Sequence, residues 1–189
     1  MGAERWPELI EDILREIGVS EGQTVLDFGC GSGNYTLPCA RIVGEKGRVY
    51  AIDKDERVLN KLARRAKALG LENVRTIKAF VSSKIPLETG SVDVALLFDV
   101  IHSYYFNSNG RRRILREVHR VLKPNGLLLF YPGDPEVFNN RAELKAIKEE
   151  IREEGFHLEK KRCGEIIHED HLVRGCVLRY RRGGVEKWG

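Results

Sequence analysis

The run from Val25 to Gly33, Val-Leu-Asp-Phe-Gly-Cys-Gly-Ser-Gly, constrains this chain more than any other part of its sequence. Val25, Leu26 and Phe28 are typical of a short strand buried on both faces. The three alternate glycines that follow let the backbone turn sharply and approach a ligand closely. A helix is expected over residues 34–43, so the loop would present free amide donors and the positive end of a helix dipole. The run predicts a strand, a ligand-binding loop and a helix.

The acid before the glycines indicates which charge the ligand carries. Dinucleotide-binding loops usually read Gly-x-Gly-x-x-Gly, whereas the sixth position here is Asn34. Asp27 precedes the first glycine, and a carboxylate there would repel a pyrophosphate and suit a positively charged ligand. The stretch resembles the S-adenosylmethionine-binding loop of class I methyltransferases, whose ligand carries an ammonium and a sulfonium. The resemblance implies cofactor contacts from Asp27, Gly29, Cys30, Gly31 and Gly33.

The rest of the chain alternates between strand and helix patterns, which favours parallel strands joined by right-handed crossovers. The resemblance implies an α/β, Rossmann-like class I methyltransferase fold. Its sheet has seven mostly parallel strands, helices on both faces and an antiparallel C-terminal hairpin strand. Further strands are expected at 48–52, 73–78, 92–98, 126–131, 156–163 and 172–180, and helices at about 7–17, 58–69, 110–122 and 144–151.

The chain length of 189 residues fits one domain. We expect an N-terminal capping helix in residues 1–20, a cofactor-binding core in 21–135, and a C-terminal helix and hairpin in 136–189. Trp6 is expected either to cap the cofactor or to pack against the core, and residues up to Asn140 could form a lid.

Ligands of open α/β sheets bind at the carboxyl ends of the strands. Asp53 ends the second strand, about twenty residues beyond the loop, where an acid can accept both hydroxyls of a ribose. Its alternative role is to cap the following helix. Lys54 could lay its methylene stem against the adenine.

The adenine pocket departs from the family pattern. Many class I methyltransferases have an Asp after the third strand, and the matching position here is Val81. Backbone groups near Val81 and Ser82 would then read the base, with Phe80 packing beside it. The alternative is that these residues only close the strand.

The segment after the fourth strand is expected to line the methyl-transfer site. Asp99-Val100-Ile101-His102 looks like the family segment that passes the sulfonium. His102 is the candidate general base because imidazole titrates near neutral pH, although a lone His is commonly structural. Tyr104, Tyr105 and Tyr131 are candidates for binding the acceptor, or for packing onto the core.

Cysteine and histidine patterns do not favour a metal. Cys30, Cys39, Cys163 and Cys176 form no Cys-x-x-Cys pair, so we expect buried, reduced thiols. The segment His168-Glu169-Asp170-His171 is expected to be an exposed turn, and its spacing does not match a zinc site.

Charge and hydropathy narrow the possible partners. The net charge of +4 is too mild to require nucleic acid, and the basic runs 111–113, 160–162 and 179–182 are expected to be solvated faces. No stretch approaches the ~20 apolar residues of a membrane span, and no targeting segment is recognisable, so we expect a cytoplasmic protein.

The sequence therefore predicts an S-adenosylmethionine-dependent methyltransferase that releases S-adenosylhomocysteine. Arg120-Val121-Leu122-Lys123-Pro124-Asn125-Gly126 also resembles the ubiquinone and menaquinone methyltransferases, so a small-molecule acceptor is the first choice. An RNA or protein methyltransferase, a non-catalytic cofactor-binding scaffold and an NAD-dependent oxidoreductase remain alternatives. The sequence does not indicate an oligomeric state.

Overall fold

The computed structural model describes residues 6–80, 84–133, 140–168 and 171–183, apart from the side chains of residues 6 and 7. Seven strands form one sheet in the order β3-β2-β1-β4-β5-β7-β6. The pairs among β1 to β5 are parallel, whereas β7 runs antiparallel to both β5 and β6. This confirms the predicted fold class. The strands are β1 (Thr24–Phe28), β2 (Arg48–Asp53), β3 (Val74–Lys78), β4 (Val92–Phe98), β5 (Leu122–Tyr131), β6 (Phe156–His168) and β7 (His171–Arg182).

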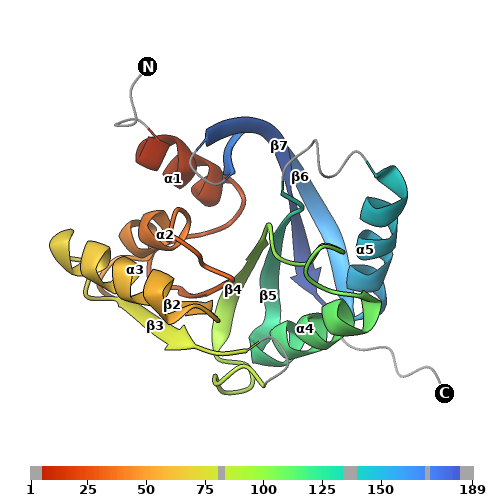
Figure 1. The fold of residues 1–189 in the computed structure, drawn as a ribbon, viewed down its shortest axis with the longest axis horizontal. Helices are drawn as coiled ribbons and strands as arrows, with labels where there is room; N and C mark the ends of the chain where they lie inside the picture. Colours follow the sequence, from red (N-terminus) through yellow and green to blue (C-terminus); the bar gives the residue numbers. More distant parts are fainter. Residues whose placement is uncertain (1–5, 81–83, 134–139, 169–170, 184–189) are drawn as a thin grey trace.

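Helices cover both faces of the sheet (Figure 1). One face carries α1 (Trp6–Glu16), α2 (Thr36–Val43) and α3 (Glu56–Ala68). The opposite face carries α4 (Ser108–Val121) and α5 (Arg141–Glu153). The tip of the β6–β7 hairpin lies near α1, at the edge where the parallel strands end.

Strand β1 lies between the two helical layers. Val25 packs in the cluster that contains the apolar residues of α1 and α2, whereas Leu26 and Phe28 pack in the cluster that contains those of α4 and α5. The prediction of a strand buried on both faces is therefore confirmed, and the loop that follows has a rigid base.

Strands β5, β6 and β7 are longer than the sequence-based expectation. β5 begins at Leu122 rather than at residue 126, and the register between β4 and β5 shifts where residues 123–126 stand, so these residues form a bulge inside the strand. The hairpin strands extend to His168 and His171 because they pair along their whole length. Leu69, the last residue of the helix expected at 58–69, is about half exposed and follows the end of α3.

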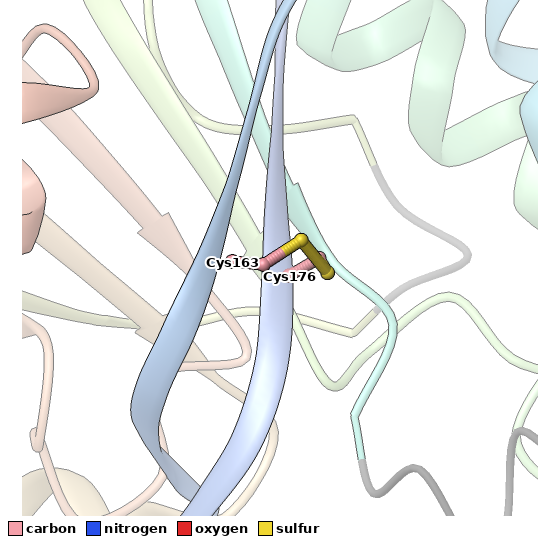
Figure 2. Close-up of a disulfide and its surroundings, with 2 residues drawn as sticks. All are labelled: Cys163 and Cys176. Carbon is pink, nitrogen blue, oxygen red and sulfur yellow. A yellow bond between two sulfur atoms is a disulfide. The ribbon is translucent and has the colours of Figure 1, made fainter.

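The prediction of four reduced cysteines is wrong for one pair. Cys163 of β6 and Cys176 of β7 stand directly opposite each other, with Cα atoms 4.0 Å apart, and form a disulfide (Figure 2). The hairpin register, which the sequence does not display, brings the two sulfurs together. Cys30 and Cys39 are free and buried, as expected.

The prediction of solvated basic faces is wrong for Arg111 but holds for Arg113, Lys160 and Lys161, which are exposed. Arg111 is buried and makes two 2.7 Å bonds to Glu150, which join α4 to α5. In the other two runs, Lys160 and Arg162 lie within ion-pair distance of Glu16, and Arg179 lies 2.9 Å from Glu159, which also binds Arg181. In each of these two runs, one acid therefore offsets part of the charge of two cations.

Within the described ranges, none of the helices combines the length and the apolar character that crossing a membrane requires.

Candidate functional site

The glycine loop is bound firmly to the end of the neighbouring strand. The backbone N–H groups of Gly29 and Cys30 both donate to the carbonyl of Ile52, at 2.8 and 3.0 Å. The N–H of Gly31 donates to Oδ2 of Asp53 at 3.0 Å. The loop after β1 and the acid that ends β2 therefore form one continuous surface.

Gly33 has no room for a side chain. Its φ is +84°, and a Cβ there would lie 2.3 Å from Cδ1 of Leu62 on α3. Gly31 also has a positive φ, of +48°, but a Cβ there would meet nothing within 4 Å. The two glycines share backbone strain and differ in packing.

That difference predicts unequal losses of stability. Gly33→Ala should lower the free energy of unfolding by about 1 to 3 kcal/mol more than Gly31→Ala, because it overpacks the contact with Leu62 as well as straining the backbone. Urea-induced unfolding of the two variants measures the difference. Equal losses would show that Leu62 moves aside at no cost.

The carboxylate of Asp53 faces the loop rather than capping a helix. Its Oδ1 accepts the backbone N–H of Asp55 at 2.9 Å, and its Oδ2 accepts that of Gly31. The N-cap of α3 is Asp55, which accepts the N–H of Arg57 at 2.8 Å. The capping alternative for Asp53 is therefore wrong.

Asp27 lies beneath the loop. Its Oδ2 accepts the hydroxyl of Thr36 at 2.5 Å, and the residue is buried. Burial raises the pKa of Asp27 to about 6, the Thr36 hydrogen bond opposes that rise, and the charge of Asp53 adds to it. Burial is also the main reason why the pKa of the nearby Cys30 thiol is raised. Asp27 does not line the cavity above the loop, so its charge would act on a ligand through the loop.

A cavity of about 360 Å³ opens between the loop and the carboxyl ends of β4 and β5. Larger hollows lie elsewhere, but the hollow of about 660 Å³ sits at the amino ends of β2 and β3, away from this loop. The cavity at the loop combines backbone amides, aromatic rings and ionisable side chains. Its walls are Gly29, Cys30, Gly31, Ser32, Asn34, Tyr35, Phe98, Asp99, Tyr131, Ile167 and His168.

Asp99 occupies an unusual backbone position at the end of β4. Its φ is +57°, and its N–H donates to the carbonyl of Tyr131 at 2.9 Å. A Cβ on Gly133 would lie 2.0 Å from Oδ1 of Asp99, so the glycine leaves the space that the carboxylate fills. A left-handed backbone at a non-glycine residue costs energy and is common at functional sites.

Two histidines flank the Asp99 carboxylate. Nε2 of His102 lies 3.4 Å from Oδ1, and Nδ1 of His168 lies 3.2 Å from Oδ2. His102 is buried beneath the ring of Tyr105, with ring centroids 4.6 Å apart, and does not line the cavity. His168 comes from the end of β6 and does line it.

The tyrosine candidates separate into two groups. Tyr131 lines the cavity although it is almost fully buried, and its ring packs edge-on against Phe98. Tyr104 and Tyr105 are exposed and are not among the lining residues, so they do not pack onto the core. Most of the segment up to Asn140 that was expected to form a lid, residues 134–139, lies outside the described residues.

The expected adenine side is only partly described. Phe80 is 61% exposed, so the alternative that it closes the core is wrong. Lys54 is also exposed, and its Nζ lies 5.9 Å from the centroid of the Tyr105 ring. Val81, Ser82 and the side chain of Trp6 lie outside the described residues.

Several residues of the cavity were not predicted from the sequence, among them Tyr35, Ile167 and His168. The Tyr35 hydroxyl donates to the carbonyl of Ile167, and the Tyr35 ring packs edge-on against Phe98. The only available signal was the His168–His171 segment, which was considered for a metal and discounted. In the part of the chain that the structure describes, no cluster of His, Cys, Asp and Glu could hold a metal ion.

Comparison with known families identifies a match over more than half of the chain. The family described as "Methyltransferase domain" matches residues 25–126. The demethylmenaquinone methyltransferase of Geobacillus stearothermophilus is 32% identical over 132 residues, which cover 69% of this chain and 54% of that protein. The chain thus spans about half the length of the curated relatives it matches. A probable cobalt-precorrin-6B C(15)-methyltransferase of Saccharolobus solfataricus is 42% identical over 66 residues, 34% of this chain and 33% of that protein.

Solved structures resemble this fold over nearly its full length. A SAM-dependent methyltransferase from Aquifex aeolicus has a TM-score of 0.70 and 28% identity, and the match covers 95% of this chain and 93% of that one. The [4+2]-cyclase SpnF has the same TM-score at 18% identity, covering 94% and 81% of the two chains. The second likeness shows the fold alone, and a fold hosts more than one reaction.

Proposed function

Because this chain belongs to the methyltransferase domain family, we propose that it is an S-adenosylmethionine-dependent methyltransferase acting on a small-molecule acceptor. The observation that carries the proposal is the glycine loop, which is bonded to one carboxylate, Asp53, and forms a cavity with another, Asp99.

The carboxylates and aromatic rings around the loop fit the chemical groups of S-adenosylmethionine. The Asp53 carboxylate at the rim of the loop would accept the ribose hydroxyls. The Asp99 carboxylate and the Phe98 and Tyr131 rings would surround the cationic end, since aromatic faces and carboxylates both attract cations. We propose Asp53, Asp99 and the backbone of residues 29–33 as the main cofactor contacts, with Lys54 and Phe80 on the adenine side and Asp27 supporting the loop from below.

The chain's own task in methyl transfer is alignment. The bound sulfonium supplies an already activated methyl group, so the protein must orient the acceptor in line with it and exclude water. The rigid loop and the aromatic walls of the cavity can do both. We propose that Tyr131 contacts the acceptor from inside the cavity, and that Tyr104 and Tyr105 contact it from the surface.

The size of the cavity fits a small molecule such as the cofactor, because about 360 Å³ is within the usual range for small-molecule sites. The relatives named for demethylmenaquinone and cobalt-precorrin-6B suggest a small organic acceptor.

Ion pairs within the basic runs weaken the RNA alternative. Arg111 is buried against Glu150, and Glu16 and Glu159 each offset part of the charge of the two cations beside them, Lys160 with Arg162 and Arg179 with Arg181. Tight nucleic-acid binding that falls steeply with rising salt would reverse this preference.

Calorimetry with S-adenosylhomocysteine tests the cofactor assignment. Wild-type protein should bind it saturably, and Asp53→Ala should weaken binding by roughly 10- to 100-fold, because the charged acceptor of the ribose hydroxyls is lost. Asp55→Ala is the matched control, since Asp55 caps α3 and its side chain makes no contact with the loop; it should cost about 1 kcal/mol of stability and leave affinity unchanged.

Two results would contradict the proposal: saturable binding of NAD without S-adenosylhomocysteine binding, or equal affinities for wild type and Asp53→Ala. A labelled-methyl screen of small quinols, phenols and tetrapyrroles then tests turnover. Tight cofactor binding with no transfer to any acceptor would favour a non-catalytic scaffold.

A further inference from the structure

The β6–β7 hairpin brings a side chain into the cavity from the far end of the chain. His168 ends β6, its side chain is largely buried, and it lines the cavity beside Asp99. Its Nδ1 lies 3.2 Å from Oδ2 of Asp99. Nδ1 of His168 is buried and makes no hydrogen bond within the described residues, so Asp99 acts on it as a nearby charge. A neutral imidazole that carries its proton on Nδ1 has Nε2 available as an acceptor.

We propose that His168 is the general base of the methyl transfer, with the Asp99 carboxylate beside it to stabilise the imidazolium that forms; this inference rests on the proposed function. Carboxylates next to catalytic histidines stabilise the imidazolium in unrelated enzymes. Asp99 is itself fixed, by its backbone bond to Tyr131 and by the space that Gly133 leaves.

The same geometry assigns His102 a different role from the predicted one. His102 is buried, approaches Asp99 through Nε2 and does not line the cavity. An acceptor in the cavity could contact His168, which lines the cavity, but not His102, which does not. His102 is a positioning residue, which binds the second carboxylate oxygen and leaves Oδ2 directed at His168.

Contacts along the hairpin hold His168 in place. The Tyr35 hydroxyl donates to the carbonyl of Ile167, and Ile166 and Ile167 are buried in the cluster that contains the apolar residues of α1. The Cys163–Cys176 disulfide links the two strands below the tip. A side chain on an edge hairpin is thus fixed well enough to act as a catalytic group.

The proton and electron balance of the step is complete. The acceptor's lone pair forms a bond to the methyl carbon, the carbon–sulfur bond breaks, and its electrons neutralise the sulfonium to give S-adenosylhomocysteine. The acceptor's proton passes to Nε2 of His168 and later to solvent. The imidazolium is stabilised by Asp99.

Several titratable groups surround this imidazole. Asp99 and His102 face it from the segment after β4, Tyr35 from the start of α2, Tyr131 from β5, and His171 from the paired position on β7. Among the described residues, Asp99 is the acid with a carboxylate oxygen within 4 Å of a ring nitrogen of His168.

Histidine ¹⁵N spectra of the full chain saturated with S-adenosylhomocysteine test this directly, without an acceptor. His168→Gln assigns the signal. We expect neutral His168 to carry its proton on Nδ1, so that Nε2 is free to take the acceptor's proton. A proton on Nε2 of neutral His168 would overturn the assignment.

Kinetics provide a second test, with the acceptor that the labelled-methyl screen identifies. His168→Gln should lower kcat by roughly 10²- to 10⁴-fold and remove the acid limb of the pH profile, while the Kd for S-adenosylhomocysteine changes little. The matched control is His171→Gln, an exposed histidine across the same hairpin, which should leave kcat unchanged. An unchanged kcat in His168→Gln would refute the base role. Failure of wild type to bind S-adenosylhomocysteine would instead refute the proposed function.

Discussion

Replacing Arg111 with alanine is expected to lower the free energy of unfolding by about 3 to 5 kcal/mol. The guanidinium is 8% exposed and makes two 2.7 Å bonds to Glu150, whose side chain is 6% exposed. It also donates to the carbonyl of Phe106 at 2.9 Å. Truncation would leave the Glu150 carboxylate buried without its partner, which is why the loss is large. Urea-induced unfolding measures it.

Arg116→Ala is the matched control on the same pair of helices. Arg116 makes two 3.0 Å bonds to Glu154, but its side chain is 66% exposed. Solvent screens that pair, so the loss should be at most about 1 kcal/mol.

A double variant separates two contributions to stability: the cost of leaving one buried charge unpaired, and the net stabilisation that the ion pair provides. Arg111→Met combined with Glu150→Leu should recover most of the lost stability, because no buried charge remains. Equal losses in Arg111→Ala and Arg116→Ala, or a double variant as unstable as the single one, would contradict a buried ion pair.

The stability of wild type relative to Asp27→Asn is expected to fall by about 2 kcal/mol as the pH rises from about 4 to 7. The folded pKa of Asp27 is about 6, above the ordinary value of 3.8, chiefly because the carboxyl is buried. Between these two values the folded state binds more protons than the unfolded state. Folding is therefore favoured below about pH 4 and loses this contribution as the pH passes 6.

Unfolding of both proteins across this pH range isolates the effect, because all other groups titrate alike in the two. Asparagine keeps an oxygen for the Thr36 hydroxyl and has no titration. The difference between the variants should be small near pH 4 and approach its full size by pH 7. A pH-independent difference would show that Asp27 is ionised at an ordinary pKa.

These two predictions concern groups whose surroundings could not be predicted from the sequence. Arg111 was expected on a solvated face, and Asp27 was expected to contact the cofactor, which stays a prediction. Both are buried, and each is paired with a residue of another element, Arg111 with Glu150 of α5 and Asp27 with Thr36 of α2. A single sequence displays the charge of such residues but not which groups surround them.

What the sequence determined is local in origin. Strand β1, the glycine loop, Asp53 at the end of β2 and strand β4 all lie where apolar runs, glycines and helical periodicity predict them. These patterns depend on residues a few positions apart, and the rule for parallel crossovers then brings the strand ends together. Fold class and the position of the loop could therefore be predicted from the sequence.

What only the tertiary structure decided depends on contacts between distant parts of the chain. The hairpin register pairs Cys163 with Cys176, and the insertion of β7 beside β5 carries His168 to Asp99. The packing of α4 on α5 buries Arg111 against Glu150. Such contacts form because strand register and helix packing minimise exposed apolar surface over the whole chain. They therefore cannot be predicted from any short stretch of sequence.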